Sequence, residues 1–172
     1  MSYSIQEISS ILNVSPVSLH PARITRLLTD SRKLSTPPET LFFALTTKNN
    51  DAHLFVSGLY ESGVRNFVIS RMLPEWKSYT DANFLKVKSP LAALQKIAAH
   101  HRSRFDIPVI GITGSNGKTV VKEWLYQLLE QDFNIIRSPR SYNSQIGVPL
   151  SVWQLDDAAE LAVFEAGISE PD

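Results

Sequence analysis

A lysine and a threonine that follow a glycine-rich turn are suited to bind the phosphates of a nucleotide. The segment is Thr113-Gly114-Ser115-Asn116-Gly117-Lys118-Thr119. Glycines let backbone N–H groups approach phosphate oxygens, and a lysine at this position can reach the terminal phosphates. The adjacent threonine hydroxyl is suited to ligate Mg²⁺. The segment therefore predicts a site for a nucleoside triphosphate and Mg²⁺.

The glycine spacing departs from the usual phosphate-loop pattern. That pattern has a glycine five positions before the second one, where this chain has Ile112, with Gly111 and Gly114 near it. The alternative interpretation is a glycine-rich turn that enters a helix and binds nothing. We favour the nucleotide site because Gly117-Lys118-Thr119 lies between a predicted strand and a predicted helix, as phosphate binding requires.

Glu165 is a second candidate functional residue. It ends the apolar run Leu161–Phe164, which predicts a buried strand. Ligands of a parallel α/β sheet bind at the carboxyl ends of the strands, so Glu165 can hold Mg²⁺ directly or through water. The alternative is a surface glutamate at a strand end. The nearby phosphate loop favours the metal role, and Lys118 and Glu165 become the candidate catalytic residues.

Two further polar groups are weaker candidates. Asp30, Ser31 and Arg32 follow a predicted strand and could bind a nucleotide base or phosphate, but a structural ion pair explains the spacing equally well. Residues 138–145 form a polar loop at the same predicted sheet edge as the phosphate loop, for which a solvated loop is the alternative. The four histidines show no metal-binding pattern, and we expect structural roles for them: His20, His53, His100 and His101.

The composition excludes several classes of function. A length of 172 residues allows one large domain, or a small domain and part of another. Seventeen basic and seventeen acidic residues give a net charge of zero, so the sequence shows no electrostatic footprint for nucleic acid. The chain has no cysteine, which excludes disulfides, thiolate metal sites and cysteine nucleophiles. Neither a signal peptide nor a membrane-spanning run is visible, so we expect a cytoplasmic location without membrane insertion.

The first hundred residues predict a small α/β domain. A capping box at Ser4–Glu7 begins a helix that ends near Asn13. A second helix is expected over Ala52–Glu61, capped by Asp51 and presenting Leu54, Phe55 and Leu59 to a core. A third begins at Ser89-Pro90 and ends near Arg104. Strands are predicted at residues 23–29, 40–47, 66–70 and 83–87.

From residue 105 onward, strands and helices alternate, which indicates a parallel sheet. The predicted strands are 107–112 (a buried strand), 134–137 and 161–164, and the predicted helices are 118–131 and 146–155. We expect a substrate-binding domain with a linker helix over residues 1–104, and the truncated first part of a phosphate-loop ATP-binding domain over residues 105–172. The fold class is therefore α/β.

Four ordered motifs resemble the Mur ligases, the ATP-dependent amide-forming enzymes of peptidoglycan synthesis. The motifs are Asp30–Arg32 with Leu41–Leu45, Thr113–Thr119, Ser141–Leu150 and Phe164–Gly167. The resemblance implies that Asp30, Ser31 and Arg32 belong to a domain that binds a UDP-sugar. It also implies that Gly114–Thr119 bind ATP and that Thr119 and Glu165 bind Mg²⁺.

Within that family, Asn143–Leu150 and Glu165–Gly167 are similar to the member that adds D-alanyl-D-alanine to UDP-N-acetylmuramoyl-tripeptide. This resemblance implies a substrate contact for Asn143. It places the rest of the central domain, a carbamylated lysine and a C-terminal domain beyond Asp172, with an alanine racemase fused downstream in some bacteria. Many relatives have a histidine shortly after the glutamate motif, where this chain has Ile168-Ser169-Glu170.

Other functions stay open from the sequence. An earlier Mur ligase, which adds the third amino acid, shares the Asp-Ser-Arg type of motif. The 172-residue chain alone could also bind substrate or nucleotide without catalysis. A folate polyglutamylating ligase shares the loop but usually lacks a preceding UDP-sugar domain of this size. A phosphate-loop switch protein would need a guanine-reading motif, and the sequence shows none.

Overall fold

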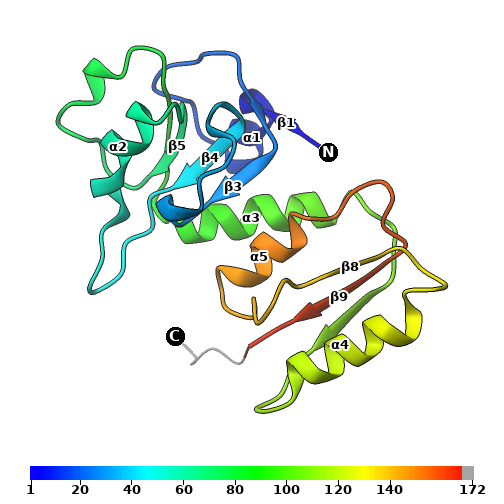
Figure 1. Cartoon of the computed structure of the whole chain (residues 1–172). Helices are drawn as coiled ribbons and strands as arrows, with labels where there is room; N and C mark the ends of the chain where they lie inside the picture. The colour runs from blue at the N-terminus through cyan, green and yellow to red at the C-terminus, as the bar shows by residue number, and fades with distance from the viewer. Residues whose placement is uncertain (168–172) are drawn as a thin grey trace. The chain divides into compact units, whose positions relative to one another are not determined.

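The computed structural model describes residues 1–167, which fall into two compact units (Figure 1). One unit spans residues 2–97, and the described part of the other spans residues 98–167 together with Met1. The division lies within helix α3 (Pro90–Arg102), upstream of the boundary expected from the sequence. Each unit contains a parallel sheet with helices, so the predicted α/β class is confirmed. The segment Ile168-Ser169-Glu170 lies outside the described residues.

The N-terminal unit is organised by a four-stranded parallel sheet whose strands follow one another in sequence order. The strands are β3 (Arg26–Leu28), β4 (Thr40–Phe43), β5 (Asn66–Ile69) and β6 (Asn83–Lys86). Every residue of β4 and β5 is buried, as expected of central parallel strands. The rings of Phe67 and Phe84 stack with centroids 5.4 Å apart. A two-stranded antiparallel sheet, β1 (Tyr3–Ser4) with β2 (Arg23–Ile24), completes the pairing.

Short helices connect these strands. Helix α1 (Ile5–Leu12) begins with the predicted capping box, in which the Ser4 hydroxyl accepts from the Glu7 N–H and the Glu7 carboxylate accepts from the Ser4 N–H. Helix α2 (Val56–Glu61) follows a turn of 3₁₀-helix. The 3₁₀ segments are η1 (Ser31–Lys33), η2 (Pro37–Glu39), η3 (Ala52–Phe55) and η4 (Trp76–Ser78).

The prediction that Leu54 and Phe55 face the core is wrong. Their exposed fractions are 76% and 43%, whereas Ala52 and Val56 are buried. The reason is the 3₁₀ turn η3, because three residues per turn change which side chains point inward relative to an α-helix. The predicted cap is confirmed, since the Asp51 carboxylate accepts from the His53 N–H at 3.0 Å.

The C-terminal unit contains a three-stranded parallel sheet with the order β7-β9-β8. Its strands are β7 (Val109–Ile112), β8 (Ile135–Arg137) and β9 (Leu161–Glu165). The crossover helices are α4 (Lys118–Leu129) and α5 (Gly147–Val152). The prediction of a buried β7 is wrong: Val109 is 39% exposed, because β7 is an edge strand of the sheet among the described residues.

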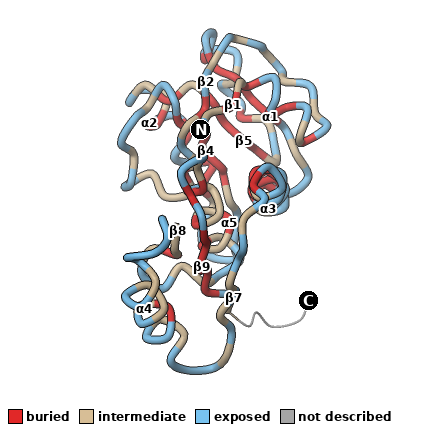
Figure 2. Tube along the Cα trace, turned by 90° about the vertical axis from the view of Figure 1, so that its right-hand side faces the viewer, coloured by how far each residue is buried: buried red, intermediate tan, exposed pale blue. Residues whose placement is uncertain are grey.

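The alternation of side chains along β9 separates the two faces of this sheet. Ala162 and Phe164 belong to one apolar cluster, which includes Val152 of α5. Leu161 and Val163 belong to the other cluster, which includes Leu125 and Leu129 of α4. By the same alternation, Glu165 lies on the α4 face. Figure 2 shows β9 buried along its length and much of α4 exposed.

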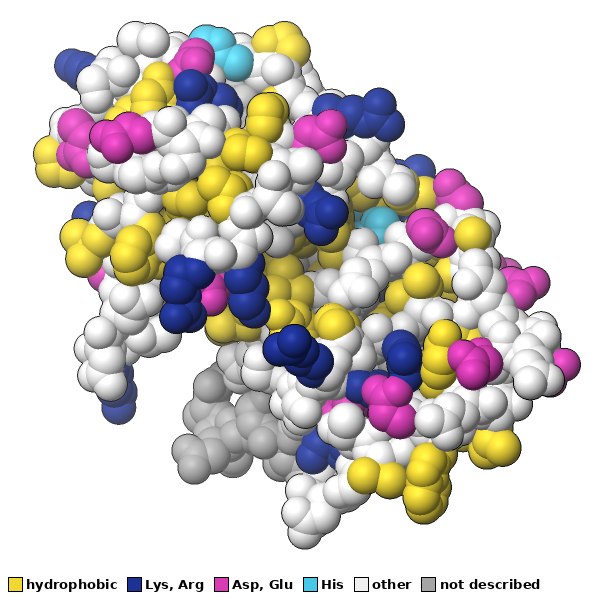
Figure 3. All heavy atoms as spheres, in the orientation of Figure 1, with side chains coloured by type: hydrophobic (Ala, Val, Ile, Leu, Met, Phe, Trp, Pro, Cys, Tyr) yellow, Lys and Arg dark blue, Asp and Glu magenta, His cyan; other side chains and the backbone are white. Residues whose placement is uncertain are grey.

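The outer face of α4 is apolar. Trp124 and Leu128 are 63% and 73% exposed, and Val120 and Val121 are also exposed. Hydrophobic side chains are visible at the surface over α4 in Figure 3.

Of the helices that the structure describes, none combines the length and hydropathy that crossing a membrane demands.

Candidate functional site

The loop between β7 and α4 has the backbone conformation of a phosphate cradle. Gly114 and Gly117 have φ angles of 133° and 77°, which only glycine adopts readily. Gly117 precedes the first residue of α4, and no side chain of the described chain caps this helix end. Ser115, Asn116 and Gly117 are exposed, so the loop is open to solvent. Uncapped N–H groups and the partial positive charge of a helix start favour an anion here.

Lys118 and Thr119 lie at this helix start but point to different partners. The Lys118 ammonium donates to the Gly114 carbonyl oxygen at 2.5 Å, so the lysine folds back over the loop. The Thr119 hydroxyl donates to Glu165 Oε2 at 3.1 Å, and its oxygen lies 3.4 Å from the Ser141 hydroxyl oxygen. The structure therefore brings together the threonine and the glutamate that the sequence assigned to Mg²⁺.

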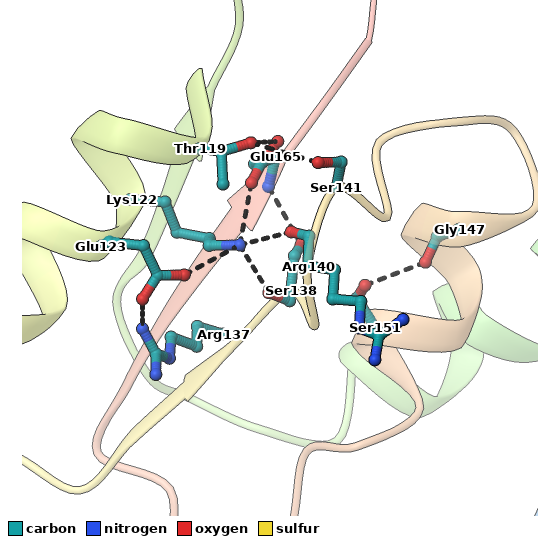
Figure 4. Close-up of polar contacts among 10 residues, drawn as sticks. All are labelled: Thr119, Lys122, Glu123, Arg137, Ser138, Arg140, Ser141, Gly147, Ser151 and Glu165. Carbon is teal, nitrogen blue, oxygen red and sulfur yellow. Dashed lines mark hydrogen bonds and ion pairs between the residues drawn. The ribbon is translucent and has the colours of Figure 1, made fainter. Parts of the chain in front are cut away.

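Glu165 is buried completely at the end of β9. Its backbone N–H donates to the Ser138 hydroxyl at 3.1 Å. Its Oε1 atom lies 2.9 Å from the Lys122 ammonium, but among the described residues no aligned hydrogen-bond donor reaches this oxygen. The contact with Lys122 is therefore primarily an ion pair (Figure 4).

The geometry of Thr119 and Glu165 fits a magnesium ion. Their side-chain oxygens are 3.1 Å apart, close to the spacing of about 3 Å between neighbouring corners of an octahedral Mg²⁺ shell. The described residues contain no cluster of three or more histidine, aspartate or glutamate side chains suited to a metal. One carboxylate and one hydroxyl leave most positions to phosphate oxygens and water, which is the usual arrangement for Mg²⁺ with a nucleotide.

Sequence reasoning missed Lys122. It lies three residues after Thr119 and four after Lys118 in α4, so the helical period places it on the same side of the helix as the site. Its side chain is fully buried. The sequence did contain a signal for Lys122, namely a lysine on the side of the helix that faces the sheet. Because lysine is rarely buried without a partner, this position predicts a nearby anion or hydrogen-bond acceptor.

The loop after β8 packs against the end of β9. The Asn143 carbonyl oxygen accepts from the Gly167 N–H at 2.6 Å, and a Cβ atom on Gly167 would lie only 2.7 Å from that oxygen. A Cβ atom on Gly147 would lie 2.8 Å from the carbonyl carbon of Tyr142. Both glycines are therefore required by close backbone approach, which brings Asn143 next to the strand end that carries Glu165.

Asp30, Ser31 and Arg32 belong to the N-terminal unit, whereas Lys118, Thr119, Asn143 and Glu165 belong to the C-terminal unit. The Asp30 carboxylate accepts from Arg32 Nε and NH2, each at 2.9 Å, and from the Arg32 N–H at 3.1 Å. These hydrogen bonds from Arg32 lower the pKa of Asp30 to about 2. The Arg32 side chain is 86% exposed, so Asp30 orients a guanidinium that solvent reaches.

Two histidines are buried and have structural partners. His53 Nδ1 lies 2.6 Å from Asp51 Oδ1, and its Nε2 accepts from the Ser70 N–H at 3.1 Å. His101 packs its ring edge against Phe105, and burial lowers the pKa of His101. These contacts fit the structural roles expected of the histidines.

The fold and the site together define a class of protein. A phosphate loop at a strand–helix junction, with a strand-end carboxylate beside its threonine, belongs to nucleotide-binding α/β domains. Residues 112–172 match the family described as the Mur ligase middle domain. The chain belongs to the Mur ligase family.

The relatives are named for one member of this family. The UDP-N-acetylmuramoyl-tripeptide--D-alanyl-D-alanine ligase of Synechocystis sp. is 38% identical over 91% of this chain and 34% of its own length. The ligase of the same name from Escherichia coli is 34% identical over 97% of this chain and 35% of its own length. The chain thus spans about a third of the length of these curated relatives.

Solved structures show the same similarity. A crystal structure of MurF from Acinetobacter baumannii matches 98% of this chain and 36% of its own, with a TM-score of 0.87 and 26% identity. The MurF ligase of Thermotoga maritima in complex with ADP matches 85% of this chain and 33% of its own, with a TM-score of 0.72 and 28% identity.

Proposed function

We propose that this protein is an ATP-dependent, amide-bond-forming ligase of peptidoglycan precursor synthesis, which adds D-alanyl-D-alanine to UDP-N-acetylmuramoyl-tripeptide. The observation that carries the proposal is the convergence of Thr119 and Glu165 beside an open phosphate loop. The names of the relatives supply the substrates. Because the reaction consumes ATP, we propose that it takes place in the cytoplasm.

The loop and Lys118 hold the triphosphate in this proposal. The Lys118 ammonium exchanges the Gly114 carbonyl for β- and γ-phosphate oxygens, while backbone N–H groups of residues 114–119 donate to the same phosphates. Thr119 and Glu165 are the residues that hold Mg²⁺. The ion supplies charge neutralisation for the phosphates.

The chemistry has two transfers. The peptide carboxylate attacks the γ-phosphorus, so that a new O–P bond forms, the bond to the β-phosphate oxygen breaks, and ADP leaves. The amine of D-alanyl-D-alanine then attacks the acyl carbon, forms the amide bond, releases inorganic phosphate and gives up a proton. Lys118 and the loop contribute by holding the phosphates in line and by stabilising their charge.

The substrate residues are part of the same proposal. Asp30 and Ser31 shape the η1 turn, and the exposed Arg32 guanidinium binds the UDP part of the substrate. Asn143, which lies against Gly167, contacts the substrate near the strand end. The fit of a guanidinium to phosphate oxygens supports the role of Arg32.

The test measures ADP release by the full-length protein with UDP-N-acetylmuramoyl-tripeptide, ATP and D-alanyl-D-alanine. We expect release only when all three are present. Lys118→Ala should reduce the rate by at least a hundredfold, since it removes one of the main contacts to the transferred phosphoryl group. Lys96→Ala, at an exposed position in α3, is the matched control.

Two outcomes would contradict the proposal. Release with UDP-N-acetylmuramoyl-dipeptide and a free diamino acid would assign the preceding step, which adds the third amino acid. Near-normal ADP release by Lys118→Ala would exclude the phosphate-binding role of that lysine. Thermal unfolding of each variant separates loss of activity from loss of fold.

A further inference from the structure

Lys122 is a buried cation that the proposed reaction does not use. It lies in the second turn of α4, and no part of its side chain is exposed. Removing an ammonium group from water is unfavourable unless anions and hydrogen-bond acceptors replace the water. A lysine in this place therefore needs a reason beyond the packing of α4.

The Lys122 ammonium joins three segments of the C-terminal unit. It donates to the Ser138 carbonyl oxygen at 2.8 Å and to the Arg140 carbonyl oxygen, both in the loop after β8. It lies 2.9 Å from Glu165 Oε1 on β9 and 3.3 Å from Glu123 Oε1 on its own helix. Figure 4 shows these contacts converging on the one nitrogen.

The loop conformation supports the importance of these bonds. Arg140 has a φ of 51°, a left-handed conformation that is unfavourable for residues with a side chain. Its carbonyl oxygen is one of the two that Lys122 binds. Ser138, the other acceptor, also receives the Glu165 N–H on its hydroxyl. The loop and the strand end are thus fixed together through Lys122.

We propose that Lys122 is a positioning residue that acts as the resident counter-ion of Glu165. It holds the buried carboxylate in place before any ligand arrives, with Oε2 directed to Thr119. Because a cation already lies 2.9 Å from Oε1, a second cation alone is repelled. The site therefore takes up a divalent ion together with the phosphates of a nucleotide, whose negative charge offsets that of Lys122.

The first test is a double-mutant cycle on thermal stability in the full-length protein. Lys122→Met and Glu165→Gln should each lower the Tm by on the order of 10 °C, because each removes one charge of the buried Lys122–Glu165 pair. The double variant still lacks the hydrogen bonds from Lys122 to the loop, so its loss should be smaller than the sum of the two single losses without disappearing. Lys96→Met serves as the control for losing an exposed lysine, and its Tm should not change. Additive losses in the double variant would overturn the proposal.

The second test measures binding of Mn²⁺ without nucleotide, by its paramagnetic signal. The parent should bind Mn²⁺ weakly, and Lys122→Met should bind it at least tenfold more tightly, because the repelling charge is gone. Lys122→Arg keeps the charge and should bind like the parent. Lys122→Gln, which keeps an N–H donor, replaces the methionine variant if that variant does not fold. Equal affinities in the parent and the neutral variants would refute the counter-ion role.

This inference rests on the proposed function for the identity of the ligand, and the two can fail separately. Binding of ADP with Mg²⁺ to the parent is measured beside the Mn²⁺ titrations. No ADP binding would overturn the proposed function, while the stability cycle and the Mn²⁺ affinities still decide the role of Lys122. ADP binding with unchanged Mn²⁺ affinities would refute the counter-ion role alone.

Discussion

Two glycines in helices are expected to respond in opposite directions to the same substitution. Gly147 is the first residue of α5, and Gly58 lies within α2. Alanine at a helical position is favoured over glycine by about 1 kcal/mol, since it restricts the unfolded chain. A Cβ atom on Gly58 has no heavy atom within 4 Å, so nothing opposes that gain. We expect Gly58→Ala to stabilise the N-terminal unit by about 0.5–1 kcal/mol.

At Gly147 the steric term is larger than the helical gain. The added Cβ would lie 2.8 Å and 2.9 Å from two backbone atoms of Tyr142, and backbone cannot rotate away as a side chain can. The loop that must move is held by the Asn143–Gly167 hydrogen bond and by the bond from the Gly147 N–H to the Ser144 hydroxyl. Overpacking typically costs about 1–3 kcal/mol. We therefore expect Gly147→Ala to destabilise the C-terminal unit by about 1–2 kcal/mol net.

Amide hydrogen exchange measures this difference, because it reports stability separately for each unit. In Gly58→Ala, the slowest amides of β4 and β5 should exchange more slowly. In Gly147→Ala, amides of β8 and β9 should exchange faster, and the Gly167 amide should lose protection first. Increased protection in Gly147→Ala would refute the reasoning, since the loop after β8 would then yield without cost.

Two other predictions concern the site residues. Gly117→Ala places a side chain at a φ of 77° without any clash. It should lower the free energy of unfolding in urea by about 1–2 kcal/mol and weaken ADP binding in a nucleotide titration. Unchanged stability would contradict the left-handed conformation. Asp30 has a pKa lowered from 3.8 to about 2, so its pairing with Arg32 stabilises the fold fully above about pH 4, and this contribution is lost as the pH falls through 2. NMR titration of the Asp30 carboxyl should give a midpoint near 2 in the parent and a higher midpoint in Arg32→Ala, which keeps only the backbone N–H donor, and equal midpoints would exclude the side-chain pairing.

The sequence was sufficient to predict which local elements carry the candidate site residues. Glycine, lysine and threonine types at a strand–helix junction predict a phosphate loop, and an apolar run ending in Glu165 predicts a strand-end carboxylate. Both predictions depend on patterns within a few residues. Strand β9 pairs in parallel with β7 along Val109–Ile112, so the carboxyl ends of the two strands lie side by side. This pairing brings Glu165, at the end of β9, close to Thr119, which follows β7.

What could not be predicted depends on the order of the strands and on the helix type. The exposure of Val109 and the central place of β9 follow from the order β7-β9-β8, which the strand patterns do not encode. The exposure of Leu54 follows from a 3₁₀ turn, which the apolar spacing does not distinguish from an α-helix. The burial of Lys122 could not be predicted either, because it depends on which face of α4 meets the end of β9.

The arrangement of these groups indicates how much of the site exists before ligands bind. Glu165 is fixed by Lys122, Thr119 and Ser138, and Asn143 is fixed against Gly167. Lys118 differs from them, because its present partner, the Gly114 carbonyl, must be exchanged for phosphate in the proposed function. At these residues, phosphate binding in the proposed function therefore changes the partner of Lys118 while Glu165 and Asn143 keep theirs, so more of the interaction with phosphate is retained as affinity and as stabilisation of the transition state.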